Sequence, residues 1–253
     1  MLRALIALLV VLAPVARPSS AGLAARAFQA SVNPSARFDA LYADIRDQHI
    51  ARDAAREKVR ELLPFIKQDF YARGGKDAPK DAWRFPVEGY AASSIGGTNG
   101  SGYLPDGYDW FDGYKGKGHP GHDIFIRDRN QDELDDVTGK PVNVLSISSG
   151  IVVAYSPDWK AGSILRGGRY LYIYDPSQNG IFYYAHQRSL LVKPGDIVSP
   201  GQVIATVGRS GRNAAAPRSP THLHVMFLAI DAGDYPRPRQ IYPDLARIGR
   251  RPR

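Results

Sequence analysis

The residues of this chain best suited to chemistry are histidines, and two of them stand together near its C-terminal end. Positions 221–227 read Thr-His-Leu-His-Val-Met-Phe, a run that favours a β-strand. Because alternate residues of a strand point to one face, His222 and His224 would lie side by side while Leu223 and Val225 face a core. Two imidazoles on one rigid face suggest a metal site or a general base, although His-x-His also occurs as ordinary half-buried histidine.

A second group, the His-x-x-x-Asp of residues 118–124, can supply the missing partners. Residues four apart in an extended segment share a face, so His119 and Asp123 could both reach one ion. A carboxylate with imidazoles suits Zn²⁺, and adding His224 gives three protein ligands with a fourth position left for water. That open position distinguishes a catalytic zinc site from a structural one. The chain has no cysteine, which excludes disulfides, thiolate zinc sites and a lipidated cysteine.

Further motifs accompany these two groups between Trp83 and Ile230. In chain order the motifs are Phe85-Pro86-Val87-x-Gly89, His119-Pro120-Gly121-His122-Asp123, Tyr184-Ala185-His186, Val192-Lys193-Pro194-Gly195-Asp196-x-Val198 with Gly201-Gln202-x-Ile204, Gly208-x-Ser210-Gly211 and His222-Leu223-His224. Each motif alone is unspecific, whereas their order and spacing together are specific. Together they resemble the lysostaphin/LytM-type zinc metallopeptidases.

The resemblance implies a role for each matching residue. His119, Asp123 and His224 would hold one Zn²⁺ per chain. His186 and His222 would be catalytic residues beside the metal that orient or deprotonate the zinc water and stabilise the tetrahedral intermediate. Zinc can lower the pKa of a bound water from 15.7 to roughly 7, and a neighbouring imidazole can then accept the proton.

The two remaining histidines are interpreted as structural. His122 alternates with its neighbours and would face away from His119 and Asp123. His49 falls in a predicted helix and has no partner at ligand spacing.

The activity implied by the resemblance is hydrolysis of peptide cross-links in bacterial peptidoglycan by a zinc-activated water. The partner would then be the peptide stems rather than nucleic acid. The absence of wall-binding repeats favours the D-alanyl-diaminopimelate bond, whereas a host with glycine bridges would make the target a glycyl-glycine bond.

Two alternatives belong to other functional classes. Members of this family that have lost zinc ligands act as non-enzymatic regulators that bind and activate other murein hydrolases, but all the ligand positions are filled here. The formal net charge of +8 instead suits a module that binds an anionic polymer, and charge alone does not choose among nucleic acid, anionic lipid and cell wall.

The first 27 residues have the pattern of a secretory signal peptide. A short positive head precedes an almost wholly apolar run over residues 4–16, and small residues follow. Cleavage after Ala21 or Ala27 would deliver the protein to the periplasm or the cell wall. An uncleaved segment would act as a short membrane tether.

Residues 28–80 form a predicted helical N-terminal segment. Apolar residues recur there at steps of three and four, which indicates one or two amphipathic helices that Pro64 is expected to kink or divide. The segment could pack on the following domain or contact a partner.

Residues 81–235 make up the predicted catalytic domain, with a mainly β fold of antiparallel sandwich or barrel-like form. Short apolar runs separated by turns predict strands at 122–127, 142–148, 151–156, 170–175, 181–186, 196–198, 203–207 and 222–230. A long loop rich in glycine and aromatic residues, 92–118, is expected to line a binding groove, where it could also occlude the site. The Pro- and Arg-rich tail, 236–253, is expected to lie extended on the surface.

The acidic segment Asp128–Asp136 partly matches a calcium loop. Acidic side chains alternate at its start, but Glu133 stands where the loop needs glycine and Gly139 where it needs glutamate. A solvated acidic hairpin is therefore the preferred interpretation, with Ca²⁺ the lesser option.

Overall fold

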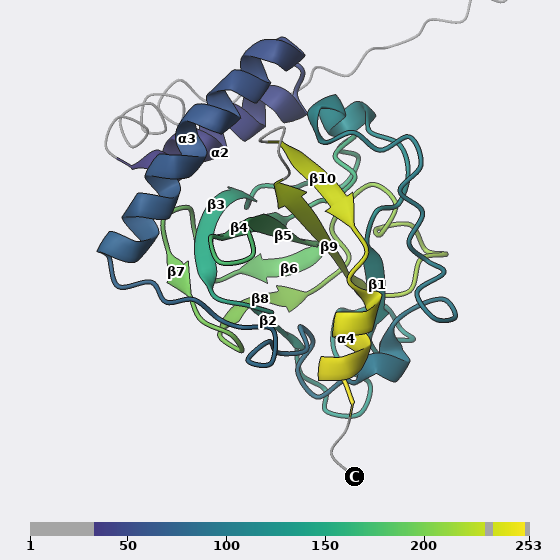
Figure 1. The fold of residues 1–253 in the computed structure, drawn as a ribbon. Helices are drawn as coiled ribbons and strands as arrows, with labels where there is room; N and C mark the ends of the chain where they lie inside the picture. Colours follow the sequence, from purple (N-terminus) through teal and green to yellow (C-terminus); the bar gives the residue numbers. More distant parts are fainter. Residues whose placement is uncertain (1–32, 231–234, 251–253) are drawn as a thin grey trace, which may run out of the picture.

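Two antiparallel sheets dominate the computed structural model, which describes residues 33–230 and 235–250 (Figure 1). The predicted signal peptide lies outside these residues. The larger sheet has the order β1 (His122–Phe125), β9 (His222–Ile230), β5 (Gly180–Ala185), β4 (Tyr170–Asp175), β3 (Gly150–Ser156) and β7 (Ile197–Val198), with β10 (Pro236–Arg239) also paired to β9. The smaller sheet has the order β2 (Asn143–Leu145), β8 (Val203–Val207) and β6 (Gln187–Leu190). The predicted mainly β, antiparallel class is confirmed.

Strand β9 is buried along its whole length and is paired on both edges. On one edge it pairs with β5, and on the other it pairs first with β1 and then with β10. Its odd-numbered residues, such as Leu223 and Val225, join the core between the two sheets, whereas Met226 and Leu228 join a second core on the opposite face. The alternation places His222 and His224 on the face of Met226, as the sequence pattern predicts.

The second core lies between the large sheet and two N-terminal helices. Helices α2 (Pro34–Arg46) and α3 (Arg52–Ala72) pack together along one side of the sheet (Figure 1). Phe38 from α2 and Ile66 and Phe70 from α3 are completely buried there. The molecule therefore has three layers, because the small sheet covers the other face of the large one.

The helical segment divides at a different place from the one predicted. Helix α3 runs continuously through Pro64, and the break between the two helices falls at residues 47–51, where Gln48 has a φ of 60°. A proline removes one backbone hydrogen bond, but Leu62, Leu63 and Ile66 are buried around it, and this packing keeps the helix intact. His49 consequently lies in the connection and not within a helix.

The C-terminal tail is not an extended surface segment over its whole length, so that prediction is wrong. Residues 236–239 form β10, and Tyr242–Ile248 form helix α4. Ile241 and Leu245 are buried in the core between the sheets, and the N–H of Ala92, which opens the short helix η1 (Ala92–Ser94), donates to the carbonyl of Gly249. The spacing of these two apolar residues is that of a helix face, which the abundance of proline and arginine obscures.

The acidic segment Asp128–Asp136 folds against its own backbone. The carboxylate of Asp128 accepts the N–H groups of Asp132 at 3.0 Å and Glu133 at 2.9 Å, and the hydroxyl of Thr221 at 2.6 Å. Asp135 likewise accepts the N–H groups of residues 137 and 138. These donors occupy oxygens that a calcium ion would need. Asp128 and Asp135 are buried rather than solvated, and residues 128–136 form no strand pair.

Within the part of the chain that the structure describes, no helix is both long enough and apolar enough to cross a membrane.

We predict that Leu245→Ala lowers the free energy of unfolding by about 2–5 kcal/mol, because it leaves a cavity in the core between the sheets. Leu191→Ala is the matched control, since Leu191 is 58% exposed, and should change stability by less than about 0.5 kcal/mol. Urea denaturation followed by circular dichroism measures both. Equal stability of the two variants would contradict the placement of α4 in the core.

Candidate metal centre

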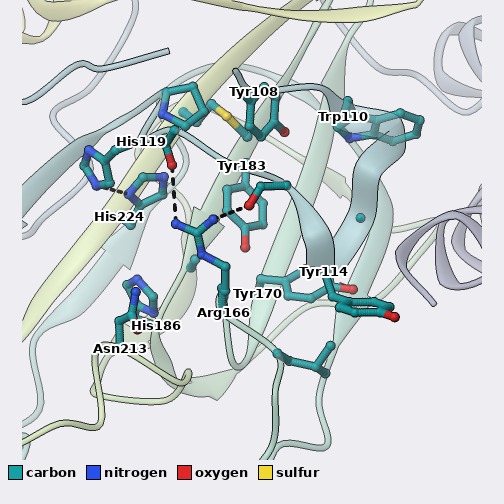
Figure 2. Close-up of a pocket in the computed structure, with 18 of the residues that line it drawn as sticks. Tyr108, Trp110, Tyr114, His119, Arg166, Tyr170, Tyr183, His186, Asn213 and His224 are labelled. Carbon is teal, nitrogen blue, oxygen red and sulfur yellow. Dashed lines mark hydrogen bonds between the residues drawn. The ribbon is translucent and has the colours of Figure 1, made fainter. Parts of the chain in front are cut away.

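Three side chains from two neighbouring strands and the loop before them converge at one point. Asp123 on β1 is paired across the ladder with His224 on β9, and His119 lies just before β1. The Nε2 atom of His119 is 3.1 Å from Oδ1 of Asp123, and Nδ1 of His224 is 2.9 Å from the same oxygen. The two nitrogens are 3.1 Å apart (Figure 2). Among the described residues this is the only group of His, Asp and Glu side chains whose ligand atoms converge in this way.

The separations of these atoms fit a zinc ion. Ligands at zinc bonds of ~2.0–2.1 Å in a tetrahedron lie about 3.3 Å from one another, close to the distances observed here. One carboxylate and two imidazoles are also the ligand set of an open catalytic zinc site. Glycine at 121 is required by the same crowding, because a Cβ there would lie 2.6 Å from Nε2 of His224.

The long loop 92–118 orients the first of these ligands. Nδ1 of His119 lies 2.8 Å from the carbonyl oxygen of Gly102, to which it can donate, so Nε2 is the ring nitrogen that faces Asp123 and could bind a metal. Backbone bonds in both directions between Leu104 and His119 hold the loop against the segment before β1. The loop 92–118, which its aromatic composition predicts to line a groove, therefore also holds His119 in place.

His186 and His222 lie beside the three convergent side chains. Their ring centroids are 4.8 Å apart, and the ring of His186 is 6.0 Å from that of His224. Nδ1 of His186 lies 2.8 Å from the carbonyl oxygen of Ser210, and Nδ1 of His222 lies 2.7 Å from that of Pro220. Each Nδ1–H donates to its carbonyl, which leaves Nε2 of both rings as a proton acceptor.

The backbone of His186 is strained into position. It has a φ of 67°, a conformation that costs a residue with a side chain on the order of 1 kcal/mol or more. The N–H of His186 donates to the carbonyl of Gly167, and Gly211, at a φ of 109°, packs so closely that a Cβ would lie 2.9 Å from Nδ1 of His186. Strain held by surrounding contacts is typical of functional sites.

Hydrogen bonds and burial shift the pKa values of the side chains in this group. Burial alone would raise the pKa of Asp123, but hydrogen bonds from His119 and His224 outweigh it and hold that pKa well below its usual range. The hydrogen bond to Asp123 raises the pKa of His119, whereas burial lowers the pKa of His224. Burial, with the neighbouring His222, also lowers the pKa of His186 to about 3. Asp123 is therefore ionised and His186 neutral at neutral pH.

The convergent group opens into a cavity of about 300 Å³ on the helix-covered face of the large sheet. Its walls come from the loop 92–118, the strands β4, β5 and β9, and helix α2. Aromatic side chains dominate the part away from the histidines and include Tyr108, Trp110, Tyr114, Tyr170 and Tyr183 (Figure 2). Trp110 and Tyr114 belong to the short helix η2 (Trp110–Lys115). The loop 92–118 thus lines a groove, while the side chain of His119 remains 35% exposed.

His122 points away from the group, in keeping with the strand alternation. Its ring stacks on Tyr103 at a centroid distance of 5.8 Å, and neither ring nitrogen has a hydrogen-bond partner among the described residues. Burial lowers the pKa of His122 to about 4. It is a buried neutral ring and not a member of the site.

The structure brings together all five residues marked by the resemblance, but their supports could not be predicted from residue type. The acceptors at Gly102, Ser210 and Pro220 are backbone carbonyls, which carry no signature in a sequence. The motif Gly208-x-Ser210-Gly211 indicates one of these acceptors, because it contains Ser210, whose carbonyl oxygen lies against Nδ1 of His186. Arg166, which reaches into the same cavity, was not singled out by any motif.

Comparison with solved structures finds chains of similar arrangement. A zinc containing peptidase from Vibrio cholerae is 23% identical over 65% of this chain and 39% of that one, with a TM-score of 0.39. The catalytic domain of lysostaphin from Staphylococcus simulans is 23% identical over 57% of this chain and 86% of that one, with a TM-score of 0.36. A putative glycyl-glycine endopeptidase lytM from Ruminococcus gnavus is 20% identical over 89% and 88%, with a TM-score of 0.43. This chain thus spans well under half of the Vibrio protein. A search of curated proteins gives no match.

The family model of peptidase family M23 matches residues 133–234. The matched segment contains His186, His222 and His224, while His119 and Asp123 precede it and join the same site through β1. The resemblance inferred from the motifs is thereby confirmed. Residues 133–234, less than half of the chain, thus resemble peptidase family M23.

Proposed function

We propose that this protein is a zinc-dependent endopeptidase that hydrolyses peptide cross-links of bacterial peptidoglycan. The observation that carries the proposal is the convergence of His119, Asp123 and His224 at metal-ligand distances, with two further imidazoles beside them in an open groove. The match of residues 133–234 to peptidase family M23 supports the reaction class. The choice of peptidoglycan follows from the lysostaphin/LytM-type motifs, and within it the D-alanyl-diaminopimelate bond is the target in a wall without glycine bridges.

His119 through Nε2, Asp123 through Oδ1 and His224 through Nδ1 would hold the metal. A bound Zn²⁺ supplies a Lewis acid and lowers the pKa of water to about 7. Ionised Asp123 provides the negative charge that favours a dication, and the carbonyl of Gly102 keeps the ring of His119 in the orientation that ligation needs.

His186 and His222 would handle the protons of the reaction. With Nδ1–H of each ring committed to a carbonyl, Nε2 is the atom that takes a proton from the attacking water and returns it to the departing amine. In its protonated form the same atom donates to the oxygen of the tetrahedral intermediate. Two rings in contact, each locked by its own backbone acceptor, allow one to act on the water and the other on the oxygen.

The groove supplies binding for an extended peptide. Its aromatic walls offer flat apolar surfaces and hydroxyl groups, and its open end leaves His119 accessible to a substrate. The signal sequence proposed from residues 1–27 would place the enzyme in the periplasm or at the cell wall, where this substrate lies. The segment 81–235 then acts as the catalytic domain, with helices α2 and α3 as its outer layer.

We predict that His224→Ala abolishes both zinc binding and peptide hydrolysis, because the two remaining ligands cannot retain the ion. Metal content by inductively coupled plasma mass spectrometry and product formation from cross-linked muropeptides measure the two losses. His49→Ala is the matched control, since His49 is exposed in the connection between α2 and α3. It should contain about one zinc and keep full activity. Full metal content in His224→Ala would contradict the assigned ligand set.

We predict that His186→Ala and His222→Ala retain zinc but lose turnover by about 10²–10⁴-fold, the usual contribution of a general acid or base. Metal content and the turnover number are measured on the same samples. Loss of zinc from either variant would mean that the ligands are misassigned. Turnover close to that of the unmodified protein would remove the residue from the mechanism.

Digestion of purified sacculi, followed by mass spectrometry of the products, tests the reaction and identifies the bond. We expect new amino termini at diaminopimelate, and we expect a chelator to abolish them until Zn²⁺ is restored. A regulator or a polymer-binding module predicts instead that the protein binds sacculi with or without chelator and releases no peptide. That second result would overturn the proposed function.

A further inference from the structure

A guanidinium group reaches into the groove close to the proposed metal site. Arg166 lies in the loop between β3 and β4, and its side chain is exposed within the cavity that His119, His186 and His224 also line. Figure 2 shows it extending toward the segment that precedes His119, with two hydrogen bonds marked. Gly118, one of its two acceptors, is the residue directly before His119, so the guanidinium lies within one residue of a proposed zinc ligand.

The backbone that carries Arg166 is fixed on both sides. The carbonyl of Leu165 accepts the N–H of Arg212, and the carbonyl of Gly167 accepts the N–H of His186. The carbonyl of Arg166 itself is packed so tightly against Gly211 that a Cβ there would lie 2.3 Å from it. The same chain segment therefore positions the backbone of Arg166 and that of His186.

Arg166 has no anionic partner among the described residues. It donates through Nη1 to the carbonyl of Gly116 and through Nη2 to that of Gly118, at 3.3 Å for the second. These bonds use two of the five N–H groups of a guanidinium and leave three. Neutral carbonyls hold the group in place without neutralising it, so its full charge faces the groove.

The other charged groups of the groove do not change this balance. Arg46 is paired with Asp47 at 2.6 Å, and Asp109 is paired with Arg52. Asp123 belongs to the metal site, and its charge would be offset by the ion. Lys117, also on the wall, has no carboxylate within ion-pair distance in the described ranges 33–230 and 235–250. The part of the groove next to the metal site thus carries a net positive charge supplied by this protein's own side chains.

We propose that Arg166 binds a carboxylate of the substrate and so determines which peptides are cleaved. The inference rests on the proposed function, because it assigns a subsite to the same groove. A guanidinium held in a fixed orientation with free N–H groups is suited to a carboxylate through paired hydrogen bonds. Two sources offer this chemistry: the carboxylate on the carbon that bears the scissile amide nitrogen in a diaminopimelate cross-link, and the free C-terminus of the peptide. A glycine bridge offers none beside its scissile bonds.

The experiment uses three synthetic cross-linked peptides and the full-length, zinc-loaded protein. The first peptide has both carboxylates free, the second has the carboxylate next to the scissile amide converted to a carboxamide, and the third has only the C-terminus amidated. The value of kcat/KM is measured for the unmodified protein, Arg166→Gln, Arg166→Lys and Arg188→Gln. Arg188 is the matched control, because it is an arginine outside the cavity that donates to two carbonyls, those of Asp132 and Glu133.

We expect Arg166→Gln to lower kcat/KM on the first peptide by about 10–100-fold, the range for a hydrogen-bonded charge pair. On the peptide that lacks the recognised carboxylate it should change kcat/KM by less than about threefold, because the interaction is already absent there. Arg166→Lys should fall between the two, since it keeps the charge but loses the paired geometry. Arg188→Gln should behave as the unmodified protein on all three. Whichever amidated peptide removes the effect of the substitution identifies the source of the carboxylate.

Three results would overturn the assignment. Equal losses on all three peptides would mean that Arg166 only holds the loop before His119, and a fall in zinc content would indicate the same. No loss on any peptide would leave Arg166 without a role in binding. Failure of the unmodified protein to cleave any of the peptides or sacculi in the presence of zinc would instead overturn the proposed function itself, together with this subsite.

Discussion

Everything in this molecule depends on the two-sided burial of strand β9. Its odd residues fill the core between the sheets and its even residues face the helices. A slip by one position would therefore turn His222 and His224 into the apolar core between the sheets. Pairing along both edges removes fraying as well. His222 and His224 take their positions from this register. Since Asp123 is opposite His224 in the ladder with β1, the same register also brings the carboxylate to the histidines.

Backbone carbonyls in the loops fix the orientation of three imidazole rings, those of His119, His186 and His222. Gly102 belongs to the loop before β1, and Ser210 and Pro220 belong to the connection between β8 and β9. Each places one oxygen within 2.8 Å of an Nδ1 atom. A ring restrained in this way presents Nε2 in one direction and one tautomer. For His224 the geometry is reversed: Nδ1 faces Asp123 and His119, which separates it from its neighbour His222 in spite of their shared strand face.

Sequence reasoning recovers the elements whose signal is periodic. The alternation of β9, the turns around the short strands and the spacing of His119 and Asp123 all survive in the structure, because each follows from local geometry. Sequence reasoning fails where tertiary packing determines the local structure. Pro64 does not end α3, because its buried neighbours stabilise the helix. Strand β6 is not predicted, because its residues are mostly polar and its register shifts between Gln187 and Ser189. Arg166 is identified only in the folded structure, where loops that are distant in the sequence line one cavity. No spacing along the chain indicates that these loops meet.

The helical layer determines how the protein can be divided by proteolysis. Helices α2 and α3 share a core with Ile151, Tyr172 and Met226 of the large sheet, and Tyr42 of α2 reaches the sheet to bond the hydroxyl of Tyr172 at 2.9 Å. The groove and the helices occupy the same face, with Tyr42 and Arg46 forming part of its wall. A protease that cuts the connection after α3 would therefore not release a smaller folded unit, because the two pieces would stay associated through their common core and separate only on unfolding.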